Sequence, residues 1–253
     1  MCLINFQLND HPKYKLVLAA NRDEFYLRPT ESAHFWKDEP QLLAGRDGMQ
    51  MGTWLGVTKT GRIAALTNFR DPSAPEANKI SRGSIVRHFL STDMDARLFL
   101  ENLIPEDYAG FNILAGDSSQ MFYYNNLEAK AAEVEPGIHG LSNHFLDTPW
   151  PKVVKGSMHL ERYLSDNENV HIDDLFDILQ DAEESIDSDL PDTGIGFELE
   201  RKLSPMFIKT PDYGTRSSTV VLIGHDDHVI FAERVYNSGN LQEDNRFEFD
   251  IEK

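Results

Sequence analysis

The chain has 253 residues and a formal net charge of -18, from 24 Lys and Arg against 42 Asp and Glu. Nucleic acid and anionic membranes are bound through clustered basic residues, so this balance argues against either partner and favours solubility. Cys2 is the only cysteine, which excludes an intramolecular disulfide and fits a reducing compartment.

No linker rich in Ser, Gly or Pro divides the sequence, and no repeat of fixed period is visible. Residues 1–253 are therefore predicted to form a single domain. The amino-terminal stretch lacks a basic region followed by an apolar run, and no stretch reaches the ~18 apolar residues of a membrane span. We therefore expect a cytoplasmic protein without a membrane span.

The chain opens with a predicted hairpin. Residues 2–8 and 14–20 are apolar, strand-favouring runs, and residues 9–12 between them have turn chemistry. The segment Asn-Arg-Asp-Glu at 21–24 follows the second run, so the hairpin returns two carboxylates and a guanidinium toward its own beginning. By itself such a polar segment is more often a solvated turn.

Further strands are predicted wherever short apolar runs flank turn residues. Three more hairpins pair residues 53–57 with 62–67, 111–115 with 121–124, and 220–223 with 229–232. Shorter strands are predicted at 131–134 and 138–142. Residues 25–40 are predicted to be irregular.

Helices are predicted where apolar residues recur at helical spacing. The first begins within residues 81–84, the second spans 93–103 with Met94, Leu98 and Leu103 inward, the third is introduced by 149–152, and the fourth runs from 173 to 179. Residues 73–78 and the acidic stretch 181–196 are predicted to be surface loops. Hairpins with helices inserted in blocks indicate an α+β domain whose antiparallel sheets are covered by helices.

The position of Cys2, directly behind Met1, is the main functional clue. Removal of Met1 would give one residue both a thiol and a free α-amine, whose ordinary pKa of about 7.7 to 8.0 lets it accept the thiol proton near neutral pH. An N-terminal nucleophile hydrolase needs this arrangement, so we predict that Met1 is removed. The alternative is that Cys2 is a small apolar residue of a buried first strand.

No spacing typical of metal ligands and no phosphate-binding glycine loop is present, so we expect neither a metal nor another cofactor for the reaction. Short motifs instead run through most of the chain. They are Met-Cys at 1–2, Ala-Asn-Arg-Asp-Glu at 20–24, Ala-Gly-Arg-Asp at 44–47, Gly-Thr-Trp-Leu-Gly at 52–56, Leu-Thr-Asn-Phe-Arg at 66–70, Gly-Leu-Ser-Asn at 140–143, Asp-Thr-Pro-Trp-Pro-Lys at 147–152 and Gly-Thr-Arg-Ser-Ser-Thr at 214–219.

In these motifs the chain resembles the NRDE family, also called the Transport and Golgi organisation 2 family. One departure is Met51, where relatives usually show the first glycine of a pair. The family in turn resembles N-terminal nucleophile hydrolases of the choloylglycine hydrolase and penicillin V acylase group. This second resemblance implies a four-layer αββα sandwich with the nucleophile at the start of an inner strand.

The resemblance also implies catalytic roles, carried over by position. Cys2 matches the nucleophile, and Asp23 matches the aspartate that orients its amine. Asn68 and Asn143 match the asparagines that hold the oxyanion or the amine, and Arg216 matches the later active-site arginine. The plainer alternatives are strand-ending asparagines and a surface ion pair for the arginine.

The same motifs supply the residues that we expect to bind substrate. They are Asn21, Arg22, Glu24, Arg46, Trp54 and Arg70. For Trp54, packing in the core is the plainer alternative. The early arginine of the hydrolases precedes the aspartate by three residues, where this chain has Ala20, whereas Arg22 is immediately adjacent.

Our leading hypothesis is a cysteine N-terminal nucleophile amidohydrolase that acts on a non-peptide C–N or acyl bond of a small-molecule substrate, with its site residues gathered in one cleft. The alternative is a non-catalytic carrier of an apolar ligand. Resemblance to eukaryotic relatives implicated in haem trafficking and lipid homeostasis makes haem or a lipid the expected ligand of such a carrier. A scaffold role is a third hypothesis, and no specific residue favours it.

Overall fold

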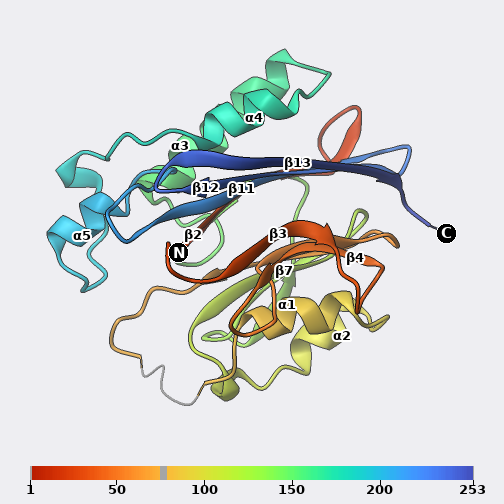
Figure 1. Cartoon of the computed structure of the whole chain (residues 1–253), viewed down its shortest axis with the longest axis horizontal. Coiled ribbons are helices and arrows are strands. Elements are labelled where there is room, and N and C mark those ends of the chain that lie inside the picture. The colour runs from red at the N-terminus through yellow and green to blue at the C-terminus, as the bar shows by residue number, and fades with distance from the viewer. Residues whose placement is uncertain (1, 75–78, 253) are drawn as a thin grey trace. The chain divides into compact units, whose positions relative to one another are not determined.

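A computed structural model describes residues 2–74 and 79–252 (Figure 1). The fold is α+β, as predicted, with two antiparallel sheets in two compact units. The first unit comprises Met1–Leu27, Pro136–Ser142 and Leu146–Glu248, and the second comprises Arg28–Glu135, Asn143–Phe145 and Phe249–Lys253. Within the described ranges no helix is long and apolar enough to cross a membrane.

The first unit contains a six-stranded sheet in the order β10-β1-β2-β11-β12-β13. Its strands are β1 (Cys2–Leu8), β2 (Tyr14–Phe25), β10 (Gly137–Leu141), β11 (Tyr213–Gly224), β12 (His228–Asn237) and β13 (Asn240–Asp250). Its helices are α3 (Pro151–Asp166), α4 (Ile172–Leu179) and α5 (Phe197–Lys202), with a 3-10 turn η2 (Asp187–Asp189).

The second unit contains a seven-stranded sheet in the order β3-β4-β5-β6-β7-β8-β9. Its strands are β3 (Thr30–Phe35), β4 (Leu42–Asp47), β5 (Leu55–Thr58), β6 (Arg62–Asn68), β7 (Phe111–Asp117), β8 (Met121–Asn125) and β9 (Lys130–Glu133). Its helices are α1 (Gly83–Leu90) and α2 (Ala96–Glu101), with a 3-10 turn η1 (Pro105–Asp107).

In the first unit, α3 and α4 cover one face of the sheet. Alternate residues of a strand share a face, so Val17 and Ala19 of β2 both reach this layer. They pack with Leu160 of α3 and with Leu175 and Phe176 of α4 in one buried cluster. This packing fixes which side of β2 each of its later, polar residues faces.

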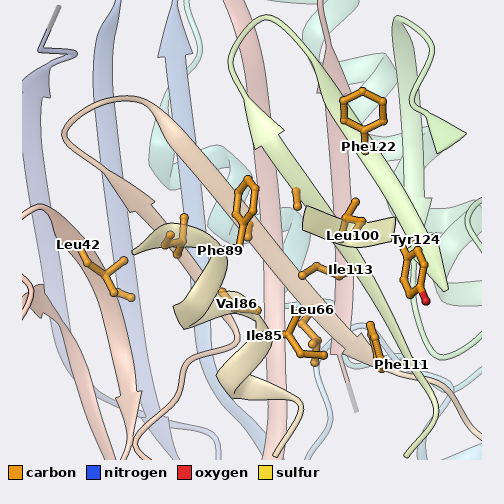
Figure 2. Close-up of a cluster of buried hydrophobic side chains, with 14 of the residues drawn as sticks. Leu42, Leu66, Ile85, Val86, Phe89, Leu100, Phe111, Ile113, Phe122 and Tyr124 are labelled. Carbon is orange, nitrogen blue, oxygen red and sulfur yellow. The ribbon is translucent and has the colours of Figure 1, made fainter. Parts of the chain in front are cut away.

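In the second unit, α1 and α2 supply the equivalent layer. Figure 2 shows Phe89 of α1 and Leu100 of α2 in one cluster with Phe111 and Ile113 of β7 and with Tyr124 of β8. Each unit therefore contributes one sheet and one helical layer, which are the components of the predicted sandwich.

All four predicted hairpins are confirmed. The predicted end of the second strand was wrong, and the residues affected include candidate site residues. Residues 21–24 do not form a turn, because β2 continues through them to Phe25. The reason is tertiary: β11 pairs with β2 as far as Phe25 opposite Tyr213, which gives these polar residues a full hydrogen-bond ladder.

Three other predictions on the elements were wrong. Residues 25–40 include the edge strand β3, whose half-exposed residues lack an apolar run, and the exposed edge strand β13 was missed for the same reason. The second helix is shorter than predicted because Asp95 caps it. Met94 and Leu98, which were predicted to face inward, are exposed, whereas Leu100 is buried. The predicted loop at 73–78 lies partly outside the described residues.

Candidate active site around Cys2

Cys2 is the first residue of β1, which lies between β2 and β10. It is directly opposite Arg22 in the antiparallel ladder, and its carbonyl accepts a hydrogen bond of 2.9 Å from the hydroxyl of Ser142. The start of the strand is therefore held by neighbours on both sides.

Asn21 shows which way the side chains of β2 point. Its amide donates to the carbonyls of Leu179 at 2.9 Å and Met206 at 2.8 Å, and it accepts from the hydroxyl of Ser218 at 2.5 Å. Asn21 therefore faces the helical layer and joins it to the sheet. Both amide protons are used within the protein, so these contacts give no support to the predicted substrate-binding role of Asn21.

Because side chains alternate along a strand, Arg22 projects from the opposite face of the sheet, away from α3 and α4. Residues directly opposite each other in an antiparallel pair share a face, so the thiol of Cys2 lies on the same side as this guanidinium. Arg22 is itself buried and lies 3.7 Å from the carboxylate of Glu24.

Asp23 returns to the helical side and is only 3% exposed. Its carboxylate accepts a hydrogen bond of 2.7 Å from the hydroxyl of Thr215, the residue opposite it on β11. Burial raises the pKa of Asp23, because a carboxylate loses hydration there. The positive charge of the amino terminus opposes that rise most, followed by the charge of Lys152, the Thr215 hydrogen bond and the charge of Arg22.

The thiol of Cys2 is enclosed although the residue as a whole is half-buried. Burial raises the pKa of this thiol above its ordinary 9.0, and the charge of Asp23 adds to the rise. The positive charge of the amino terminus, the backbone N–H of Asp23 and the charge of Arg22 lower the pKa of the thiol, but they do not outweigh burial. Attack by Cys2 at neutral pH therefore requires a base.

This pKa direction gives an expected pH profile. In protein that retains Met1, alkylation of Cys2 by iodoacetamide should be slow at pH 7, where less than about one per cent of a thiol with such a pKa is ionised. The rate should still be increasing above pH 9, because the thiolate population has not saturated. Mass spectrometry of the terminal peptide measures it, with a short cysteine peptide as the reference. A plateau below pH 8 would contradict the burial argument.

Arg216 occupies a β-bulge. Thr215 is opposite Asp23 and Ser217 is opposite Arg22, so Arg216 is the extra residue between them. Its guanidinium donates to the carbonyls of Phe25 and Tyr26, each at 3.0 Å. Arg216 therefore holds the end of β2, and burial together with the charge of Arg22 lowers its pKa.

Three of the predicted residues lie together in the second unit. The side-chain amide of Asn143 donates to the backbone carbonyl of Asn68 at 2.8 Å, and the backbone N–H of Arg70 donates to the carbonyl of Asn143 at 2.8 Å. Asn143 is completely buried. These bonds fix the backbone of both asparagines relative to each other.

Arg46 and Trp54 also belong to the second unit. The guanidinium of Arg46 binds both carboxylate oxygens of Asp38 at 2.7 Å and lies 4.1 Å from the ring centroid of Trp36. This pairing lowers the pKa of Asp38 to about 2. The ring of Trp54 packs against Gly45 so closely that a Cβ there would lie 2.4 Å from it. The gathering of these residues with Cys2 in one cleft stays a prediction.

Lys152 is not among the predicted site residues, although it closes the motif at 147–152. It is 3% exposed in the first turn of α3, next to Trp150 and Val153, which pack against Leu3. The available signal was a lysine between two inward-facing apolar positions. Across residues 2–74 and 79–252, no group of three or more His, Cys, Asp or Glu side chains could hold a metal.

The fold is shared with a solved hydrolase. The chain aligns with the Caenorhabditis elegans N-acylethanolamine-hydrolyzing acid amidase (NAAA) ortholog at a TM-score of 0.51 and 9% identity, covering 87% of this chain and 92% of that one. At this identity the match shows the fold alone, which is that of the N-terminal nucleophile hydrolases, as predicted.

Sequence comparisons are more specific. The chain is 36% identical to the human Transport and Golgi organization protein 2 homolog over 100% of both chains. It is 26% identical to Transport and Golgi organization protein 2 of Drosophila melanogaster, over 92% of this chain and 91% of that protein. The family model described as Transport and Golgi organisation 2 matches residues 1–238. The chain therefore belongs to the Transport and Golgi organisation 2 family.

Proposed function

We propose that this protein is a cysteine N-terminal nucleophile amidohydrolase that cleaves a non-peptide C–N bond of an acyl amide. The observation that carries the proposal is the arrangement at the start of β1. There Cys2 is directly opposite Arg22 on the neighbouring strand, and the next residue of that strand, Asp23, carries a buried carboxylate. A fold shared with an N-acylethanolamine-hydrolyzing amidase supports the reaction class.

In this mechanism Met1 is removed, and the α-amine of Cys2 is the base. The sulfur attacks the amide carbonyl while the thiol proton passes to the α-amine, which gives a tetrahedral intermediate with a negatively charged oxygen. The C–N bond then breaks, and the α-amine returns the proton to the leaving nitrogen. Water hydrolyses the resulting thioester, which releases the acid and restores the thiol.

The raised pKa of the Cys2 thiol gives the α-amine a necessary role. Because the thiol is protonated at neutral pH, the reaction depends on proton transfer within the terminal residue. Asp23 would hold the amine in position through its carboxylate. Arg22, on the same face as the thiol, would contact the substrate, with Glu24 fixing its guanidinium.

The oxyanion donors in this proposal are the side-chain amides of Asn68 and Asn143. Removal of one such donor typically slows acyl transfer about a hundredfold or more. The hydrogen bond between Asn143 and the carbonyl of Asn68 would keep this pair preorganised. Arg216 would act more indirectly, since its guanidinium is bound to the backbone at the end of β2. Arg46, Trp54 and Arg70 would contribute to substrate binding.

The experiment compares two forms of the same protein against a panel of N-acylethanolamines and N-acyl amino acids. In the processed form Cys2 is the first residue, and in the matched control Met1 is retained. We expect an acyl adduct on the terminal peptide of the processed form and none on the control, because only the processed form has the amine on the nucleophile. Intact mass verifies processing and peptide mass locates the adduct. No adduct and no hydrolysis from the processed form with any substrate would contradict the proposal.

A further inference from the structure

Lys152 is a buried cation to which the reaction scheme above gives no role. Among the lysines that the structure describes it alone is buried, with 3% of its surface exposed. Removal of an ammonium group from water costs several kcal/mol unless an anion compensates it, and lysine is therefore almost never fully buried without a partner. The buried carboxylates of the first unit are the candidates for that anion.

The position of α3 restricts where the anion lies. Trp150 and Val153, on either side of Lys152, pack with Leu3 of β1 and with Met206 in one buried cluster. Leu3 directly follows Cys2. The first turn of α3 therefore lies over the start of β1, on the face of the sheet that Asn21 and Asp23 also occupy.

Asp23 is the buried carboxylate that meets this requirement. It lies on β2, the strand next to β1, and the charge of Lys152 lowers its pKa against the larger effect of burial. The other buried carboxylates of the first unit are less suitable. Glu200 accepts hydrogen bonds from the backbone and hydroxyl of Thr193, and Glu233 lies on β12, two strands beyond β2.

We propose that Lys152 is a positioning residue, which keeps the Asp23 carboxyl ionised so that the carboxylate can hold the α-amine of Cys2. This inference rests on the proposed function of Cys2. It also explains how the site works without the early arginine of the hydrolases, whose place is taken by Ala20. A cation on α3 would replace a cation on β2 as the counter-charge of the aspartate.

Several groups lie close enough to Asp23 to influence its charge. They are the amino group at the start of the chain, the ammonium of Lys152 on α3, the hydroxyl of Thr215 on β11, the guanidinium of Arg22 on β2, the thiol of Cys2 on β1 and the phenol of Tyr26 after β2. Of the two side-chain cations, Arg22 projects from the opposite face of the sheet. Loss of Lys152 would therefore remove the side-chain cation on the carboxylate's own side of β2 and leave only the α-amine that the carboxylate is proposed to hold.

The first test is the pH profile of acyl-adduct formation by processed Lys152→Met and Lys152→Arg. Methionine keeps the apolar length of the side chain and removes its charge, so Asp23 and the α-amine beside it should hold their protons to higher pH. We expect the acid limb of the profile to move up by about one pH unit, which is about a tenfold lower rate on that limb, with recovery at high pH. Lys152→Arg should restore the wild-type profile.

Lys155→Met is the matched control, because Lys155 lies on the same helix and pairs with Asp181 and Glu183 instead. Its profile should equal that of the wild type. Two results would overturn the positioning role while the amidohydrolase function held. One is an acid limb that is unchanged in Lys152→Met, and the other is a rate of adduct formation that falls equally at every pH and is not restored by Lys152→Arg.

The second test does not require activity. The folding equilibrium constants of wild type, Lys152→Met, Asp23→Asn and the double variant are measured by urea denaturation. We expect Lys152→Met to lower the constant at least about tenfold more when Asp23 is present than when asparagine replaces it, because only the carboxylate loses a charged partner. Additive effects would overturn the pairing. If coupling is found but no processed form makes an adduct, the amidohydrolase proposal has failed and the electrostatic coupling of Lys152 to Asp23 stands.

Discussion

Cys2→Ser is expected to abolish acyl-adduct formation on the terminal peptide while the fold is retained. A serine hydroxyl holds its proton far more strongly than a thiol, and the α-amine that suffices for sulfur would not generate an equivalent oxygen nucleophile in the same enclosed position. The substitution exchanges one atom in a half-buried residue, so the free energy of unfolding should change by less than about 1 kcal/mol. Peptide mass spectrometry and urea denaturation measure the two quantities.

The same pair of proteins distinguishes catalysis from the carrier alternative. Haem binding is measured by absorbance titration in parallel with adduct formation. An adduct on the processed wild type that disappears in Cys2→Ser supports catalysis. If processed wild type forms no adduct with any substrate and both proteins bind haem equally, the carrier hypothesis would replace the amidohydrolase.

Strands that contain an apolar run could be predicted from the sequence, whereas polar strand segments that depend on pairing with another strand could not. The four hairpins, including the one that begins with β1, were predicted because buried faces require apolar residues at alternate positions. It failed at residues 21–24, which are polar and are held in β2 by the ladder to β11. The local sequence around residues 21–24 gives no indication of β11, which lies nearly 200 residues further along the chain.

The sequence suggested which residues belong to the candidate site, but it did not suggest how they are arranged. Motifs singled out Cys2, Asp23 and Arg216 as candidates, but the β-bulge that separates Thr215 from Ser217 and gives Arg216 its place has no local sequence signal. The pKa of the Cys2 thiol could not be predicted for a related reason. The neighbouring charges are visible in the sequence, whereas burial, which is the larger effect, depends on the folded surroundings.

Gly156→Ala in α3 is expected to destabilise the protein by about 1 to 3 kcal/mol, the usual cost of overpacking. In an exposed helix the same change would stabilise by about 1 kcal/mol. Here a Cβ would lie 2.3 Å from the amide nitrogen of Asn5 and 2.8 Å from its Cγ, so α3 would be pushed away from β1. Because α3 also carries Lys152 and β1 begins with Cys2, we expect Gly156→Ala to lower acyl-adduct formation as well as stability.

Asn5→Ala provides the test of this contact. The side-chain amide of Asn5 is buried, and neither its nitrogen nor its oxygen has a hydrogen-bond partner within the described part of the chain, so alanine removes an obstruction without breaking a bond. We expect Gly156→Ala to become neutral or to stabilise by up to about 1 kcal/mol in the Asn5→Ala background, because only helix propensity then remains. Glu161→Ala, at an exposed position of the same helix, is the control for a change of helix propensity away from this contact. Urea denaturation measures the three single variants and the double variant against the wild type. A Gly156→Ala penalty of the same size without the Asn5 side chain would show that this contact does not cause the loss of stability.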